Sequence, residues 1–332
     1  MRSRRGMVAR ARGWLRARNR VREHFELRVG RPPRMLRPIN HVDHVQWYKF
    51  FYRDARLPRL ADKVLVKDHI RECLGEGWTV PTLWTGTALP DSPSWPVPYI
   101  LKANHGSGWN IIVTDDNPLD VGKARRQTNR WMKRVYGGWW GEWLYSLISP
   151  QLLVEPLLLV DGTIPMDLKM WTFHGRVHNI QLQDHPGHPH RGASNYTVDW
   201  VRQPFIGKAI PEYPFDHPRP ERLEEMVAAA ERLATGFPFM RVDFYLLADQ
   251  PLVGELTFYP TSGFSPRFPL EYDDALGALW RMPNGALPWP WRMRRQQRAA
   301  RTTITSGRLE IAHDHDSPPS GDAQTDPLRA PK

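Results

Sequence analysis

The sequence contains one cysteine, Cys73, among 332 residues, and its apolar runs are short. A single cysteine excludes a disulfide-stapled scaffold and fits a reducing compartment. No run approaches the ~18 apolar residues of a transmembrane helix, and the first residues lack the apolar segment of about 7–15 residues that marks a secretory signal. We therefore expect a cytoplasmic protein.

Acidic residues are almost missing from the first 37 positions. This segment holds 13 arginines, from Arg2 to Arg37, against two acids, Glu23 and Glu26, and so accounts for the whole net charge of +11. The rest of the chain is neutral on balance. A basic surface spread over the fold is the usual footprint of a nucleic-acid-binding protein, and the sequence does not support one.

Residues 1–40 form this basic arm, and its apolar residues fall roughly on one helical stripe. The stripe comprises Met7, Ala11, Trp14, Leu15, Val21 and Phe25. Such a pattern suits a helix that lies on an anionic membrane surface, here at the inner face of the membrane. Two other interpretations stay open. The arm is a solvated or disordered leader, or the chain begins later, at Met7 or Met35.

The body of the sequence alternates strands and helices, with several hairpins, which favours an α+β fold over a doubly wound parallel sheet. Strands are expected at residues 99–103, 111–114, 168–173, 177–183, 239–247 and 252–258. Helices are expected at residues 63–74, between the N-cap Asp62 and Gly75, at residues 118–136, and at residues 220–236. Residues 281–332 are rich in Pro and Arg and then in Ser, Pro and Asp, and a disordered tail is expected there.

A lysine and a glycine loop form the first candidate site. Lys102 stands near the end of the expected strand 99–103, and Asn104-His105-Gly106-Ser107-Gly108 follows it. A lysine offers a point charge to a phosphate, and glycines let backbone N–H groups approach its oxygens. The pattern differs from a Walker A loop, in which Gly-Lys-Ser/Thr opens a helix. A purely structural glycine loop is the alternative.

Two carboxylates in apolar strands form the second candidate site. Asp243 and Glu255 lie on successive expected strands, and burying both would be unfavourable unless something neutralises their charge. A divalent cation would do so, and Mg²⁺ is commonly shared between one or two carboxylates and nucleotide phosphates. The alternative is a salt bridge from Arg241 to one of the two acids. In the cation interpretation, Arg241 instead faces the phosphates.

Three further residues are weaker candidates. Glu155 interrupts an apolar run. It would either contact a base or ribose, or mark an edge-strand bulge at Pro156. Lys169 begins an expected strand and is either a second phosphate ligand or a solvated lysine. Arg191 follows a histidine-rich loop, 185–190, and is a candidate contact for an anionic substrate. The histidine spacing of that loop matches no closed zinc set.

Taken in order, these segments resemble the ATP-grasp superfamily, and specifically its TupA-like family, named for teichuronopeptide biosynthesis. The stretches that carry the resemblance are Asp62-Lys63, Leu101–Gly108, Val154-Glu155, Asp167-Leu168-Lys169, Phe173-His174-Gly175, Asp199-Trp200, Gly236–Phe239, Arg241-Val242-Asp243, Gly254–Pro260 and Ser262-Gly263-Phe264. The resemblance covers about residues 45–280.

The resemblance implies that two α+β lobes enclose ATP. Residues 41–154 would contain the first lobe with the glycine loop, and residues 155–280 the second lobe with the metal site. The residues implied to bind ATP are Lys102, His105, Gly106, Ser107, Gly108, Glu155 and Lys169. The residues implied to bind Mg²⁺ are Asp243, Glu255 and Thr257. Arg241 would face the γ-phosphate or an acyl phosphate, and it is implied to be catalytic together with Lys102 and Lys169.

Two departures from the family pattern matter. The position two residues after the metal-binding glutamate is usually asparagine, and here it is Thr257, whose hydroxyl is a weaker ligand. The domain that normally precedes the ATP lobes is mostly missing, because only about 60 residues precede Asp62. Substrate recognition is therefore expected to come from elsewhere or to differ.

The function that the resemblance implies is that of an ATP-dependent carboxylate–amine ligase acting through an acyl phosphate, in the biosynthesis of a cell-surface polysaccharide. Its partners would be ATP, Mg²⁺, a carboxylate, an amine and an anionic polysaccharide, with peripheral membrane contact through the basic arm and no nucleic acid. Two rivals stay open. One is a kinase of a sugar or glycan, and the other is a non-catalytic or glycosyltransferase-associated module that binds glycan through its tryptophans.

Overall fold

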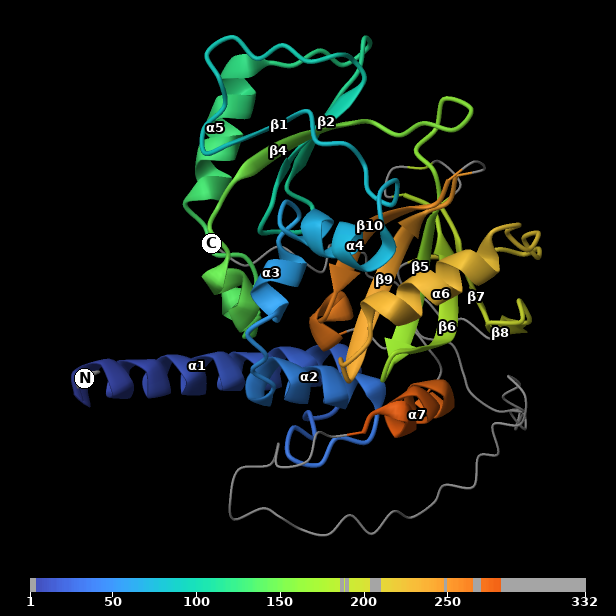
Figure 1. Ribbon diagram of the computed structural model, residues 1–332. Helices are drawn as coiled ribbons and strands as arrows, with labels where there is room; N and C mark the ends of the chain where they lie inside the picture. Colours follow the sequence, from blue (N-terminus) through green and yellow to red (C-terminus); the bar gives the residue numbers. More distant parts are fainter. Residues whose placement is uncertain are drawn as a thin grey trace.

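The computed structural model describes residues 4–185, 188, 191–203, 210–247, 250–264 and 270–281. These residues form two antiparallel sheets flanked by helices, as Figure 1 shows, which confirms the expected α+β fold. The expected tail, residues 281–332, lies outside the described residues except for Arg281. None of the helices in the described part is both long and apolar enough to cross a bilayer.

The first sheet has four strands in the order β1-β4-β2-β3. Its strands are β1 (Trp84–Gly86), β2 (Tyr99–Ala103), β3 (Asn110–Val113) and β4 (Leu152–Pro156). Helix α5 (Val121–Met132) begins where the Asp120 side chain accepts a hydrogen bond from the Lys123 amide. The helix packs against the apolar face of the sheet through Ala124 and Trp131. The opposite face carries Lys102 and is left for the neighbouring sheet.

The second sheet has six strands in the order β10-β9-β5-β6-β7-β8. Its strands are β5 (Asp167–Phe173), β6 (Arg176–Gln183), β7 (Ala193–Tyr196), β8 (Arg202–Gln203), β9 (Phe239–Tyr245) and β10 (Leu252–Thr257). The β5–β6 hairpin turns at His174 and Gly175, whose φ angles of 51° and 77° lie in the left-handed region. The hairpin expected there is therefore confirmed.

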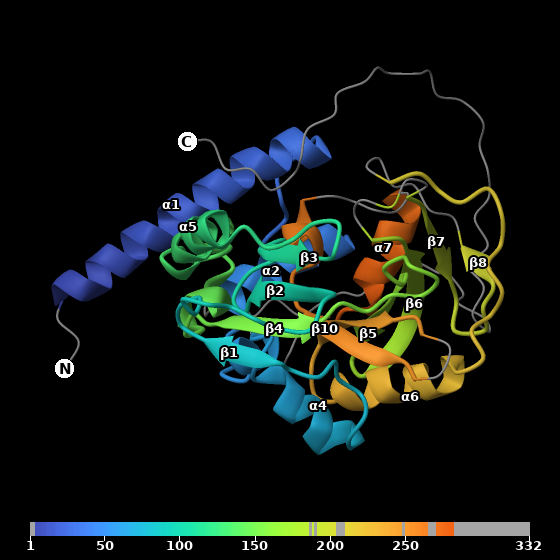
Figure 2. The ribbon, with the colours of Figure 1, turned by 90° about the horizontal axis from the view of Figure 1, so that it is seen from above.

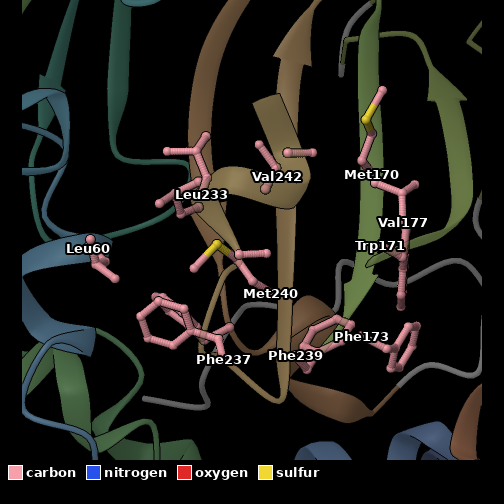
Figure 3. Close-up of a cluster of buried hydrophobic side chains, with 14 of the residues drawn as sticks. Leu60, Met170, Trp171, Phe173, Val177, Leu233, Phe237, Phe239, Met240 and Val242 are labelled. Carbon is pink, nitrogen blue, oxygen red and sulfur yellow. The ribbon is translucent and has the colours of Figure 1, made fainter. Parts of the chain in front are cut away.

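One face of the second sheet packs under helix α6 (Leu223–Leu233) and forms the main core. Alternate residues of each strand point to this face because side chains in a strand alternate between the two faces. Figure 3 shows Met170 of β5, Met240 and Val242 of β9 and Leu233 of α6 in this core. The other face carries the intervening residues, many of which are polar.

Further helices precede and connect the sheets. They are α1 (Arg4–Val29), α2 (His41–Phe51), α3 (Leu57–Ala61), α4 (Val66–Leu74), α7 (Leu270–Leu279) and the short 3-10 turns η1 (Gly138–Trp140), η2 (Trp143–Leu147) and η3 (Pro260–Gly263). Helix α2 packs against α7 and η3. Figures 1 and 2 show the two sheets as neighbours, with the edge strand β10 of the second sheet towards the first.

The basic arm is helical, and its second half is part of the fold. Val21 and Phe25 are completely buried and pack with Phe50 of α2 and with Phe264. The interpretation of the arm as a solvated leader is therefore wrong for this half, and the same two residues are not available to a membrane. Trp14 and Leu15 are exposed, and the N-terminal end of α1 projects from the body in Figures 1 and 2.

The helix expected at residues 63–74 begins three residues later than predicted, because Asp62 caps a turn and not the helix itself. The Asp62 Oδ1 atom accepts hydrogen bonds from the amides of Val64 at 2.8 Å and Leu65 at 3.3 Å. Helix α4 ends at Gly75, whose φ of 88° is in the left-handed region, as expected. This placement puts Lys63 in the turn and Lys67 in the first turn of the helix.

Candidate active site

Lys102 and Glu155 lie on neighbouring strands of the first sheet and form a buried ion pair. The β2–β4 register places them on the face of the sheet opposite to α5, and Lys102 Nζ lies 2.5 Å from Glu155 Oε2. The other oxygen, Oε1, lies 2.5 Å from Nζ of Lys67 on α4. Both carboxylate oxygens of Glu155 are therefore bound by lysines, and the side chain is only 6% exposed.

The charges of this cluster stabilise one another against burial. Burial alone would raise the pKa of Glu155, but Lys102 and Lys67 outweigh it and hold that pKa below its usual value. Burial alone would lower the pKa of Lys102, but Tyr245 and Glu155 raise it. Burial lowers the pKa of Lys67 and also that of Lys63. The cluster holds more positive than negative charge, which suits an anion.

Asp243 lies at the centre of a second cluster on the second sheet. It pairs directly with Lys169 of β5 and with Glu255 of β10, so the three side chains project from the same face. Lys169 Nζ lies 3.3 Å from Asp243 Oδ2 and 2.7 Å from Asp167 Oδ2. Burial would raise the pKa of Asp243, but Arg241 and Lys169 lower it below its usual value. Asp243 is therefore a carboxylate in the folded protein.

Arg241 connects the two acids. Its guanidinium donates to both oxygens of Asp243, at 2.7 and 2.6 Å, and to Glu255 Oε1 at 3.3 Å. The salt bridge that the sequence left as the alternative to a cation is thus present in the structure. Thr257 Oγ1 donates to Glu255 Oε1 at 2.7 Å and accepts from Arg241 at 3.1 Å. The Glu255 side chain is 37% exposed and can exchange partners.

A small pocket lies between the lysine cluster and the second sheet. Lys63, Lys67, Lys102 and Glu155 line it from one side, and Tyr245 and Gly254 of the second sheet line it from the other. A backbone bridge between Thr79 and Val253 joins the two halves near the pocket. Glu255 opposes the burial effect on the pKa of Lys63, so these two side chains are close enough to interact.

Three residues of this pocket were not identified as site residues from the sequence. Lys63 was noted only as part of the Asp62-Lys63 pair, and Lys67 follows it at the helical spacing of four residues, which places both near one end of α4. Tyr245 follows Asp243 by two residues and so projects from the same face of β9. The strand and helix periodicities were therefore the available signals.

The glycine loop lies beside the pocket and is held by Lys63, whose Nζ donates to the Gly106 carbonyl at 2.6 Å. Gly108 has a φ of 70°, and a Cβ atom on Gly106 would meet the Trp109 ring at 2.7 Å, so both positions favour glycine. His105 is buried, with its ring nitrogens at 2.9 Å from Asn104 Oδ1 and 3.2 Å from the Trp131 carbonyl. Its imidazole therefore faces the protein interior.

The acidic cluster fits a hard cation that is shared with phosphates. Asp243 and Glu255 are direct cross-strand partners, and two carboxylates with the Thr257 hydroxyl form the all-oxygen set that Mg²⁺ prefers. The described residues contain no group of three or more His, Cys, Asp or Glu side chains that could hold a metal. A cation here would consequently need oxygen ligands from a substrate, and Arg241 would have to release Asp243 as well as Glu255.

Arg191 is not joined to this pocket by any contact among the described residues. Its amide donates to the His188 carbonyl at 3.2 Å, and its Nε atom has no hydrogen-bond partner in the described part of the chain. Four residues of the adjacent histidine-rich loop, 186, 187, 189 and 190, lie outside the described residues. The role of Arg191 as a substrate contact stays a prediction.

The chain is similar to one protein family and to several solved structures. A family model described as TupA-like ATPgrasp matches residues 43–281. Among solved structures, the chain resembles the ATP-grasp ligase PsnB complexed with minimal precursor, at 12% identity and a TM-score of 0.39, covering 69% of this chain and 61% of that one. It also resembles the D-alanine–D-alanine ligase from Bacillus anthracis, at 18% identity and a TM-score of 0.37, covering 66% and 62%. No curated protein matches the chain.

Proposed function

Because the chain belongs to the TupA-like ATP-grasp family, we propose that it is an ATP-dependent ligase that joins a carboxylate to an amine through an acyl phosphate. The observation that supports this proposal is the surplus of lysines, Lys63, Lys67 and Lys102, in a pocket that Tyr245 and Gly254 of the second sheet also line. Asp243 and Glu255 pair directly on these same two strands of the second sheet, β9 and β10. An anionic triphosphate bound together with a cation matches this division of charge.

In this proposal, the ion pairs of the free protein exchange partners when ATP binds. Lys102 would leave Glu155 for a phosphate, and Lys169 would turn from Asp167 and Asp243 to another phosphate. Glu155 would remain held by Lys67 at the edge of the nucleotide site. Each lysine is already desolvated and positioned, so the exchange needs little reorganisation.

Asp243 and Glu255 would hold Mg²⁺, with Thr257 as a weaker oxygen ligand. The ion would neutralise the charge of the β- and γ-phosphates. Arg241 would then be released towards the γ-phosphate, where its guanidinium matches the geometry of phosphate oxygens. Asp243 is ionised because its pKa is lowered, so the site needs no deprotonation before a cation binds.

The reaction that we propose has two steps and needs no protein nucleophile. A substrate carboxylate oxygen attacks the γ-phosphorus, the bond from that phosphorus to the β-γ bridging oxygen breaks, and ADP leaves. An amine then attacks the acyl carbon, the carbon–oxygen bond to phosphate breaks, and phosphate and the amine proton leave. Lys102, Lys169 and Arg241 would position the phosphates and offset the negative charge that moves between them. We further propose that the substrate belongs to cell-surface polysaccharide biosynthesis, and the TupA-like family match supports this proposal.

A thermal-shift measurement with Mg²⁺ and ATP, ADP or GTP tests the nucleotide site. A ligand that binds only the folded state at a hundredfold excess over its Kd stabilises it by about 2.7 kcal/mol. We expect Mg·ATP to stabilise the parent, Lys102→Ala to lose most of this effect, and the exposed-lysine control Lys123→Ala to retain it. Full retention by Lys102→Ala would contradict the proposal.

Hydroxylamine tests the chemistry. It traps an acyl phosphate as a hydroxamate, but it does not react with a sugar phosphate. With the carboxylate substrate present, we expect hydroxamate that depends on ATP and on Lys102. ATP consumption with a sugar phosphate as product, and no hydroxamate, would favour the kinase.

A further inference from the structure

We propose that a second substrate subsite extends from Lys169 across strands β6 and β7, where Gln181 and Asn195 bind an uncharged group that both donates and accepts hydrogen bonds. This inference rests on the proposed function, since it assigns these residues to a substrate of the same reaction. The group is a hydroxyl or an amide, because both have this hydrogen-bonding chemistry.

The subsite is part of a polar row that crosses all six strands of the second sheet. Direct cross-strand partners form the row, which runs Glu255, Asp243, Lys169, Gln181, Asn195 and Gln203 from β10 to β8. Directly paired residues project from the same face of a sheet. The row therefore places the amides of β6 and β7 beside the lysine and the carboxylates of the nucleotide site.

The amides of Gln181 and Asn195 are buried and lack hydrogen-bond partners for most of their polar atoms in the described structure. Gln181 and Asn195 are completely buried. Within the described part of the chain, neither side-chain polar atom of Gln181 has a hydrogen-bond partner, and Nδ2 of Asn195 has none either. Asn195 Oδ1 accepts from Asn179 at 3.5 Å, a distance at which a hydrogen bond is weak.

Such amides are unfavourable as ordinary core residues. A buried polar group without a partner destabilises a protein, and apolar side chains of similar size would fit a strand interior. The other face of β6 shows this alternative, because Ile180 and Leu182 are fully buried in the main core. Amides retained at a stability cost beside a reaction centre are typical of binding residues.

A cavity lies at the far end of the row. Its volume is about 320 Å³, and its lining includes Gln203 of the row, Thr197 and Tyr272 of α7. Tyr272 donates a hydrogen bond to Asn179 Oδ1 at 2.9 Å, which places α7 over this face of the sheet. A ligand that extends from the nucleotide site along the row would have room for its distal part under α7.

The ligand chemistry follows from the side chains. Each amide carries two N–H donors and one acceptor oxygen, and neither Gln181 nor Asn195 is charged. The cationic groups end at Lys169, so a substrate carboxylate would lie at the nucleotide end and its neutral part over the two amides. Sugar hydroxyls and a peptide amide are the two sources of this chemistry.

Two apolar variants and one matched control test the subsite. Gln181→Met and Asn195→Leu keep the side-chain size and remove the amide. Ser194→Ala is the control, because Ser194 is also fully buried with an unpartnered hydroxyl in the described structure, but it projects from the opposite face of β7. The ligand probes are D-glucuronate, which carries hydroxyls, and L-alanyl-L-alanine, which carries an amide. Binding is measured calorimetrically, with and without Mg·ATP.

We expect both amide variants to be at least as stable as the parent and to bind Mg·ATP normally. We expect their affinity for a probe that the parent binds to fall by about 5- to 100-fold, with no change in Ser194→Ala. Binding of D-glucuronate alone would identify hydroxyls, and binding of the dipeptide alone would identify an amide.

Three results would overturn the subsite: loss of stability in both amide variants, unchanged probe affinity in them, or no binding of either probe to the parent. Binding of Mg·ATP is scored separately. Its absence in the parent would refute the proposed function, while probe binding without nucleotide would still decide the subsite.

Discussion

Replacing Glu155 by glutamine should destabilise the free protein by about 3–5 kcal/mol, because it removes the only carboxylate of a buried cluster and leaves its lysines unpaired. The magnitude follows from the geometry. Glu155 is 6% exposed, and Lys67 and Lys102 each lie 2.5 Å from one of its oxygens. An exposed ion pair contributes only about 0–1 kcal/mol, so burial decides the size of the effect.

Urea denaturation of parent and variant measures this loss. The matched control is Glu72→Gln, which breaks a pair with Arg59 at 3.0 Å whose side chains are 60% and 49% exposed, and it should change stability by less than about 1 kcal/mol. Added salt should weaken the control pair but leave the Glu155 cluster nearly unchanged, since buried pairs are screened little.

The pH dependence has a definite sign. The pKa of Glu155 is lowered from its ordinary value of 4.5, so its contribution is fully present above pH 4.5 and is lost as the pH falls through the lower folded-state pKa. Parent and Glu155→Gln should therefore converge in stability in acid. A loss below about 1 kcal/mol at neutral pH would refute the description of a tightly held buried cluster.

Three other predictions concern the framework of the site. Burial lowers the pKa of His41 from 6.5 to about 3. The free energy of unfolding should therefore fall by about 1.4 kcal/mol per pH unit as the pH drops below 6.5. In urea titrations at different pH values, His41→Phe should reduce this slope. Phe25→Ala should lower the free energy of unfolding by about 3–5 kcal/mol. Leu27→Ala, at a position that is 83% exposed, should change thermal stability little. Equal effects of the two variants would mean that α1 does not pack as described. Gly263→Ala should lower the melting temperature, because φ is 67° and a Cβ atom would lie 2.6 Å from Gln46 Nε2. Gly13→Ala, with open space around it, should not.

Local patterns were sufficient to locate most of the secondary structure and both charged clusters. Strands β2, β5, β6, β9 and β10 lie where alternation and turn residues predicted them, with ends that differ by a few residues. Lys102 was found because a lysine near a strand end is followed by a glycine loop, and Asp243 because a carboxylate in an apolar strand is unfavourable without a partner. That argument is local, so it does not require knowledge of the fold.

Features that depend on long-range contacts were not predictable in the same way. The position of Lys67 against Glu155 depends on how α4 packs beside the first sheet. The polar row depends on the register of six strands, which hydrophobic patterning within one strand does not determine. Gln181 and Asn195 therefore passed unnoticed, although Gln181 stands between the apolar residues Ile180 and Leu182.

The position of the basic arm was also not predictable from local sequence patterns. A helix with one apolar stripe looks the same whether the stripe meets lipid or protein. Only the packing of Val21 and Phe25 against Phe50 and Phe264 distinguishes the two. A membrane contact would therefore have to use other residues of α1, such as the exposed Trp14 and Leu15.

The docked half of α1 also covers apolar surface of the body. Deleting residues 1–34 would remove Val21 and Phe25 and uncover Phe50 and Phe264. A protein shortened in this way would expose a new apolar surface to other proteins and tend to aggregate. Recombinant expression should for this reason retain the whole helix.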